Sequence, residues 1–188
     1  MTNTKQQARL VRIFRWIHRK IAIPLLIFFF IVSLTGFLLG LKKNTGLLAP
    51  TQKGASSDLS DWLSMDSLQK IAIAVYRDSA PSKEPATLDR IDVRPDKGIA
   101  KFSFKGTYWG VQLDCTSGKL LLIEKRHSDL IEDIHDGSII DNLTGTDGEQ
   151  IKVVYTTILG ISLLLLVISG FWLWYGPKRI RYNKRQHS

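Results

Sequence analysis

Two uncharged hydrophobic segments lie near the two ends of the chain. The first runs from residue 21 to 41 and the second from residue 153 to 175. At a rise of about 1.5 Å per residue, each forms a helix of roughly 30 Å, the thickness of a bilayer's hydrocarbon core. A soluble core helix of this length would show a polar stripe, and residues 28–32 (FFFIV) leave none. We therefore expect two transmembrane helices, surrounded by lipid bilayer.

Between these segments the pattern changes from helical to alternating. From residue 63 to 76, apolar residues recur near helical spacing, which predicts an amphipathic helix. Four short runs follow, at residues 88–94, 99–104, 108–113 and 119–123. The connections between them are typical of hairpins, so the runs predict a four-stranded antiparallel sheet. We expect the helix to cover one face of this sheet, over a core of Phe102, Phe104, Val111 and Leu113.

The net charge of +9 is concentrated in two short tails. Residues 1–20 and 176–188 together hold 11 of the 26 basic residues and no acidic residue, so residues 21–175 sum to about −2. Short basic segments beside hydrophobic spans stay on the cytoplasmic side of a membrane. We therefore expect both termini in the cytoplasm and residues 42–152 outside. Because the positive charge lies at the ends of the spans, a nucleic-acid partner is not expected.

These elements predict a membrane α+β protein, in which two transmembrane helices flank an extracytoplasmic helix and a four-stranded antiparallel sheet. Residues 42–57 have turn chemistry without apolar periodicity and are interpreted as a linker. The single cysteine, Cys115, has no partner for an internal disulfide. The expected segments are a tail at 1–20, a span at 21–41, the linker at 42–57, a folded domain at 58–125, an amphipathic segment and loop at 126–152, a span at 153–175 and a tail at 176–188.

Four local motifs resemble the PepSY-associated transmembrane family. Residues 14–21 (FRWIHRKI) are similar to its basic, aromatic and histidine-containing entry into the membrane. Residues 111–120 (VQLDCTSGKL) resemble its strand, turn and strand, and residues 134–138 (IHDGS) its Leu-His-x-Gly element. Residues 168–174 (ISGFWLW) are similar to its Gly-x-x-x-Trp exit. The resemblance extends over most of the chain and identifies residues 58–125 as a PepSY-like domain.

The resemblance implies a bacterial inner-membrane protein with a periplasmic PepSY domain. Larger members resemble haem-bearing reductases of iron-siderophore complexes, so this chain is expected to be an accessory or partner-binding protein that assists electron transfer in ferric iron or siderophore reduction. It is not expected to be an enzyme by itself. A homodimer or a larger membrane reductase is the implied partner. The alternative is a regulator or inhibitor of a cell-envelope peptidase, because PepSY domains are also associated with that role.

Three histidines, His18, His127 and His135, are the candidate ligands of a cofactor, and haem b is the candidate group. No catalytic residue and no dedicated metal site are predicted. A bis-imidazole iron needs its two nitrogens only about 4 Å apart, twice a typical metal to nitrogen bond. His18 and His135 are expected on opposite membrane faces, roughly 30 Å apart, and His127 and His135 lie about 12 Å apart along a continuous helix.

A single chain therefore lacks an obvious bis-histidine site. Haem would need a second chain, an irregular bend that brings two of these histidines together, or a ligand other than histidine. Each histidine also has a structural alternative. His18 can reach the membrane interface from the end of a span, and His135 can hydrogen-bond the turn before the second span.

Overall fold

The structure is a computed structural model that describes residues 2–80, 85–145 and 149–186. The ends of the two expected tails and residues 146–148 of the expected loop lie outside these ranges. The chain divides into two compact units, one formed by residues 1–36 and 134–188 and the other by residues 37–133. Each unit is described here by itself.

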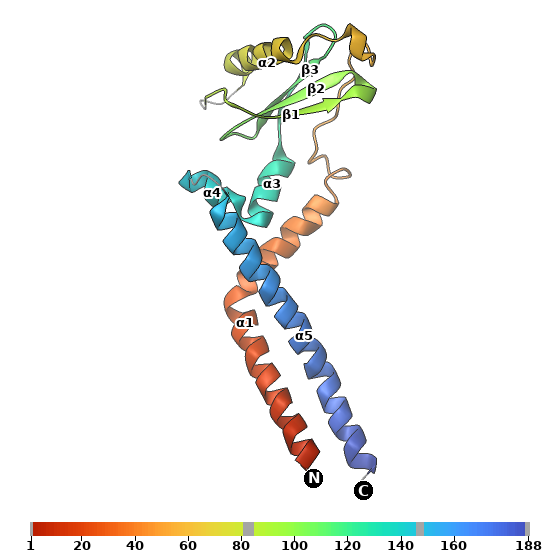
Figure 1. Cartoon of the computed structure of the whole chain (residues 1–188), viewed down its shortest axis with the longest axis vertical. Helices are drawn as coiled ribbons and strands as arrows, with labels where there is room; N and C mark the ends of the chain where they lie inside the picture. The colour runs from red at the N-terminus through yellow and green to blue at the C-terminus, as the bar shows by residue number, and fades with distance from the viewer. Residues whose placement is uncertain (1, 81–84, 146–148, 187–188) are drawn as a thin grey trace. The chain divides into compact units, whose positions relative to one another are not determined.

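The first unit consists mainly of two long antiparallel helices, α1 (Thr2–Gly40) and α5 (Gln150–Gln186). Figure 1 shows them side by side, with the start of α1 next to the end of α5. Both helices pass the length and hydropathy test for a membrane span, which confirms the two predicted spans. Large apolar side chains such as Leu26 (69% exposed) and Phe30 (63% exposed) point away from the protein. Such surfaces are stable when they face lipid.

Both helices continue through the basic tails, beyond the segments expected at residues 21–41 and 153–175. The contacts between the two helices pair their residues in a single antiparallel register. Phe14 packs against Trp172 with ring centroids 5.6 Å apart, and Phe28 meets Tyr155 edge to face at 6.2 Å. Gly176 allows Val11 to approach so closely that a Cβ at position 176 would lie 2.8 Å from its methyl group. Small residues of this kind let membrane helices pack closely.

The second unit contains the predicted helix and sheet. Helix α2 (Met65–Ser79) is capped by Ser64, whose hydroxyl accepts from the amide of Ser67. The four strands pair in sequence order as an antiparallel meander. They are β1 (Leu88–Arg94), β2 (Ile99–Phe104), β3 (Trp109–Asp114) and β4 (Leu120–Lys125). The fold prediction is therefore confirmed, with strand bounds that differ from the expected ones by two residues at most.

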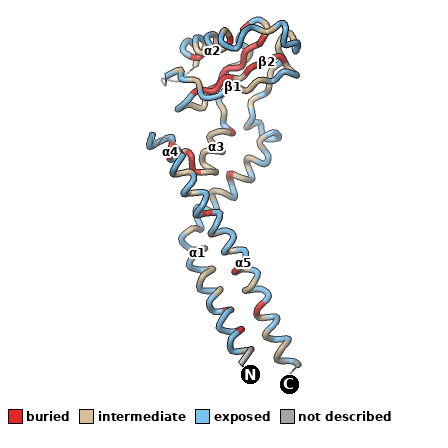
Figure 2. Tube along the Cα trace, in the orientation of Figure 1, coloured by how far each residue is buried: buried red, intermediate tan, exposed pale blue. Residues whose placement is uncertain are grey.

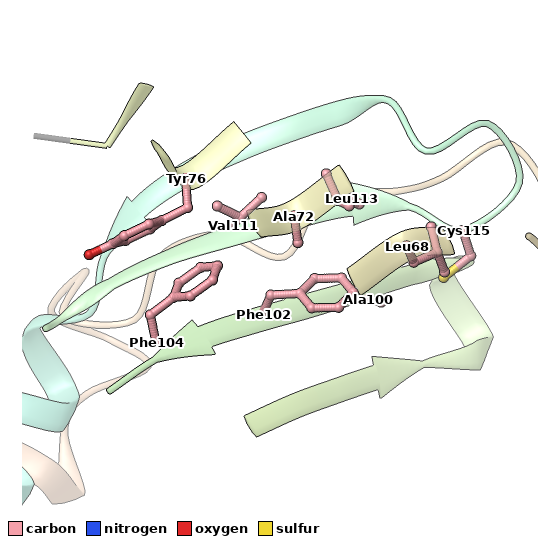
Figure 3. Close-up of a cluster of buried hydrophobic side chains, with 9 residues drawn as sticks. All are labelled: Leu68, Ala72, Tyr76, Ala100, Phe102, Phe104, Val111, Leu113 and Cys115. Carbon is pink, nitrogen blue, oxygen red and sulfur yellow. The ribbon is translucent and has the colours of Figure 1, made fainter. Parts of the chain in front are cut away.

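The core lies between α2 and one face of the sheet. Figure 3 shows Phe102 and Phe104 of β2 pointing toward Leu68, Ala72 and Tyr76 of α2. All four predicted core residues, Phe102, Phe104, Val111 and Leu113, are buried. Tyr76 stacks on Phe104 with ring centroids 4.0 Å apart. In Figure 2 the buried positions of this unit concentrate on the strands and on α2.

Cys115 is fully buried at the end of this core. Burial, followed by the nearby carboxylate of Asp114, raises the pKa of its thiol to about 11. A thiol is reactive only as the thiolate, so this cysteine is unreactive while the domain is folded.

Part of the expected linker is held against the sheet. The amide of Gln52 donates to Oε1 of Gln112 (3.1 Å), the amide of Gly54 to the carbonyl of Lys97 (2.8 Å), and the amide of Ala55 to Oδ1 of Asp114 (3.3 Å). We call residues 50–56 the strap. The strap has no regular secondary structure, so its lack of apolar periodicity gave no indication that it belongs to the domain.

Candidate functional site

His18 and His135, two of the three candidate histidines, each contact a hydroxyl group. Nδ1 of His18 on α1 lies 2.8 Å from Oγ of Ser169 on α5. Ser169 is buried, and its hydroxyl donates to the carbonyl of Leu166 at 3.1 Å. A serine hydroxyl has one hydrogen, so when that hydrogen goes to Leu166 the oxygen is left to accept from the histidine.

His135 lies near the end of α3 (His127–Asp136) and repeats this arrangement with α1. Its Nδ1 is 3.0 Å from Oγ1 of Thr35, and the Thr35 hydroxyl donates to the carbonyl of Ile31 at 2.7 Å. Gly36 leaves space for the ring, because a Cβ at position 36 would lie 3.2 Å from Cε1 of His135. The imidazole is therefore held by a hydrogen bond on one side and by backbone on another.

One tautomer satisfies the hydrogen bonds of both rings in the same way. If each hydroxyl gives its hydrogen to a backbone carbonyl, each Nδ1 must carry the proton, and each Nε2 keeps its lone pair. Within the described ranges, Nε2 of neither ring takes part in a hydrogen bond. A neutral imidazole that donates from one nitrogen and offers the other is the form in which histidine binds metals.

The structure does not bring the three histidines together. His18 and Thr35, the residue that contacts His135, are 17 positions apart on α1, about 25 Å along the helix axis. His127 is exposed and starts α3, eight positions before His135, or about 12 Å along that helix. The described residues contain no group of three or more His, Cys, Asp or Glu side chains that could hold a metal ion. One chain thus offers single imidazoles at two levels of the helix pair.

A polar cluster follows His135 at the turn into α4 (Ser138–Thr144). Oδ1 of Asp136 accepts from the amide (3.0 Å) and the hydroxyl (2.6 Å) of Ser138, and Oδ2 lies 3.0 Å from Nζ of Lys152. Burial opposes ionisation, but these hydrogen bonds and the lysine charge outweigh it and lower the pKa of Asp136. Asp136 is therefore a fixed anion beside His135 in the sequence.

Two further residues define the geometry of this turn. Gly137 has φ of +84°, and a Cβ there would lie 2.7 Å from the ring of Tyr155, so only glycine fits. Asp141 accepts from the amides of Ile151 (3.1 Å) and Lys152 (2.7 Å) and so caps the first turn of α5. The expected amphipathic segment is therefore two short helices joined at Gly137.

The sequence pattern did not predict the contacts that Thr35 and Ser169 make with the histidines. A usable signal was present, since each is a hydroxyl residue in an apolar span. One histidine and one hydroxyl residue lie toward each end of the helix pair. The pairing itself joins residues 151 and 100 positions apart, which the hydrophobic pattern does not encode.

Two apolar helices that flank a helix-covered antiparallel sheet define the chain as a membrane-anchored α+β protein. A model of the family described as the PepSY-associated TM region matches residues 6–188, so the chain belongs to this family. The resemblance found from its motifs is thus confirmed. Comparison with curated proteins and comparison with solved structures each gave no match.

Proposed function

We propose that this protein is an accessory subunit for electron transfer in the bacterial inner membrane, with both termini in the cytoplasm and the PepSY domain in the periplasm. In this proposal, His18 and His135 each supply one imidazole to haem b. The second ligand of each iron comes from another copy of the chain or from a larger membrane reductase. Ferric iron or a ferric siderophore complex is the proposed final electron acceptor.

The observation that carries the proposal is the shared hydrogen-bonding arrangement of the two imidazoles. Nδ1 of each imidazole is hydrogen-bonded to a hydroxyl, that of Ser169 or that of Thr35, and Nε2 has no hydrogen bond within the described ranges. Two copies of this arrangement, one toward each end of the uncharged segments, are expected if ligands are needed at both membrane faces. Haem, when bound, exchanges one electron at a time and would let charge pass between those faces.

A bis-imidazole haem does not fit within one chain, because the two imidazoles are separated by about 25 Å along α1. As single ligands they fit, since each is oriented by a hydroxyl and half-buried. The proposal therefore requires a second chain. His127 is exposed and has no hydrogen bond in the described ranges, so we leave it out of the ligand set and use it as a control.

The test is an absorption spectrum of the full-length protein, expressed with iron and a haem precursor and purified in neutral detergent. The wild type should show a Soret band. His18→Ala and His135→Ala should each remove part of it, and the double variant should remove all of it. His127→Ala, the matched control, should keep the wild-type ratio of haem to protein, and circular dichroism should show equal helix content in every variant.

Two results would contradict the proposal. One is a wild type that carries no haem after such expression, and the other is a His135→Ala variant that keeps its haem in full. Regulation or inhibition of a cell-envelope peptidase, the alternative suggested by the PepSY domain, would then become the better proposal.

A further inference from the structure

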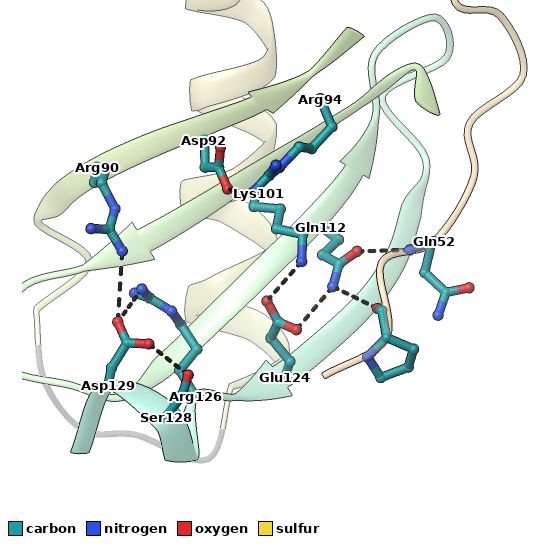
Figure 4. Close-up of polar contacts among 11 residues, drawn as sticks. Gln52, Arg90, Asp92, Arg94, Lys101, Gln112, Glu124, Arg126, Ser128 and Asp129 are labelled. Atoms are coloured by element: carbon teal, nitrogen blue, oxygen red, sulfur yellow. Dashed lines mark hydrogen bonds and ion pairs between the residues drawn. The ribbon is translucent and has the colours of Figure 1, made fainter. Parts of the chain in front are cut away.

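The second unit contains a cavity of about 450 Å³ on the sheet face that α2 does not cover. Side chains alternate between the two faces of a strand, so Lys101 and Ser103 point away from the core that holds Phe102. Both line the cavity, together with Arg90 of β1, Glu124 of β4 and Asp129 of α3. Figure 4 shows the polar contacts around this face. A volume of this size is in the range of small-molecule sites.

Three carboxylates of the cavity are already engaged. Oε2 of Glu124 accepts from Nε2 of Gln112 at 2.9 Å. Asp129 accepts from the guanidinium of Arg126 and from the hydroxyl of Ser128. Asp92 is paired with Arg94 at 3.0 Å. Each of these three carboxylates thus has a hydrogen-bond partner inside the protein, and Glu132 is the fourth carboxylate of the lining.

The donors, in contrast, are not fully used. Nζ of Lys101 is 3.9 Å from Oε1 of Glu124, too far for a hydrogen bond, although its side chain is only 18% exposed. Ser103 is 5% exposed, and its hydroxyl has no hydrogen bond to any residue in the described ranges. Arg90 lies 3.6 Å from an Asp129 oxygen that Arg126 already occupies. Buried polar groups without partners are costly, so these donors favour a ligand with acceptor oxygens.

Gly110 shapes the floor of the cavity. It pairs with Ser103 across β2 and β3 and with Glu124 across β3 and β4. A Cβ at this position would lie 3.1 Å from Cδ of Arg126 and 3.6 Å from Cγ of Glu124. The missing side chain thus leaves room for Arg126 and Glu124 over this part of the sheet.

We propose that this cavity binds a small oxyanion, a carboxylate or a phosphate group, through Lys101, Ser103 and Arg90. An ammonium, a hydroxyl and a guanidinium together supply charge-assisted hydrogen bonds to such oxygens. The strap supports the arrangement from one side, since Gln112 donates to the carbonyl of Pro50 at 3.1 Å while it holds Glu124. The inference uses none of the histidines and does not depend on the proposed electron-transfer function.

The test is isothermal titration of the full-length protein in neutral detergent with inorganic phosphate and, separately, with succinate. Succinamide and sodium chloride at matched ionic strength are the controls for shape and for general charge screening. Saturable binding of either anion supports the site. The anion that binds more tightly shows whether the site prefers a phosphate or a carboxylate group. No saturable binding of either anion overturns the proposal, as does equally strong binding of succinamide.

Variants then locate the binding. Lys101→Met and Ser103→Ala should each weaken binding, the former by roughly tenfold or more, as expected for the loss of a charge-assisted hydrogen bond. Arg77→Gln removes a positive charge from the exposed face of α2 and should leave binding unchanged. If Lys101→Met does not fold, Ser103→Ala decides the matter, because it removes only one hydroxyl. Unchanged binding in Ser103→Ala and Lys101→Met, or an equal loss in Arg77→Gln, would overturn the assignment.

Discussion

Truncation of Phe104 to alanine should strongly destabilise the domain formed by α2 and the sheet. The ring is 2% exposed and stacks on Tyr76 at 4.0 Å. Removal of a buried phenylalanine ring costs about 3–5 kcal/mol, which includes the cavity that it leaves. Loss of the stacked aromatic pair contributes about 0.5–1.5 kcal/mol of this total.

The buried thiol of Cys115 provides the assay. It is the only cysteine of the chain and is fully buried, so a thiol reagent modifies the protein only when the domain opens. If opening is fast and reversible, the labelling rate is proportional to the open population. A loss of about 3–5 kcal/mol then accelerates labelling of Phe104→Ala by roughly 100- to 5,000-fold, at about 1.4 kcal/mol per tenfold.

Two controls separate core packing from other effects. Phe104→Leu keeps most of the apolar area and should accelerate labelling far less than Phe104→Ala. Lys105→Ala changes the exposed neighbour and should leave the rate near that of the wild type. An unchanged rate in Phe104→Ala would refute the burial of Phe104 between α2 and the sheet, because a one-residue slip places this position on the opposite face.

Four further predictions follow from the other features. Reporter fusions at the C-terminus and within residues 50–57 should report the cytoplasm and the periplasm respectively, and a result on the same side would refute the proposed topology. Tyr76→Phe should stabilise the domain by up to about 1 kcal/mol in urea unfolding, because its buried hydroxyl has no partner in the described ranges. Burial opposes ionisation of Asp114, but hydrogen bonds from Ser117, Thr116 and Ala55 lower its pKa, so the stability that it contributes is present above about pH 4 and is lost as the pH falls through the lowered value. Asp114→Asn should therefore unfold more easily at pH 7 and approach the wild type in acid. Gly36→Ala should press on the ring of His135 and shift or weaken any Soret band, whereas Gly40→Ala, where a Cβ has open space, should not.

The elements of the fold could be predicted because each has its own local pattern. Uncharged runs identified α1 and α5, helical spacing identified α2, and alternation placed Phe102 and Phe104 on the same face of β2. The hairpin connections allowed only short loops, so the strand order followed from the sequence order. These features depend on neighbours within a few residues, which a single sequence contains.

The candidate sites could be predicted only in part, because they depend on long-range contacts. The motif identified His135, but its contact with Thr35 requires the register of one helix against another. Alternation places Lys101 and Ser103 on the face opposite Phe102, yet whether they face open water or a lined cavity depends on Asp129 and on the strap. Neither relation leaves a periodic signal in the sequence.

The strap shortens the connection between α1 and the sheet domain that is free of hydrogen bonds to the sheet. Helix α1 ends at Gly40 and the first strap residue is Pro50, and within the described ranges no hydrogen bond joins residues 42–49 to the sheet. On the other side, α3 begins at His127, and the amide of Arg126 still donates to the carbonyl of Tyr108 at 2.6 Å. Lys42, Leu48 and Ala49 line the cavity, so related proteins should differ in length within residues 43–47 and keep a constant length from β4 to α3. A spacer for engineering, such as an epitope or a fluorescent domain, belongs in the first of these connections.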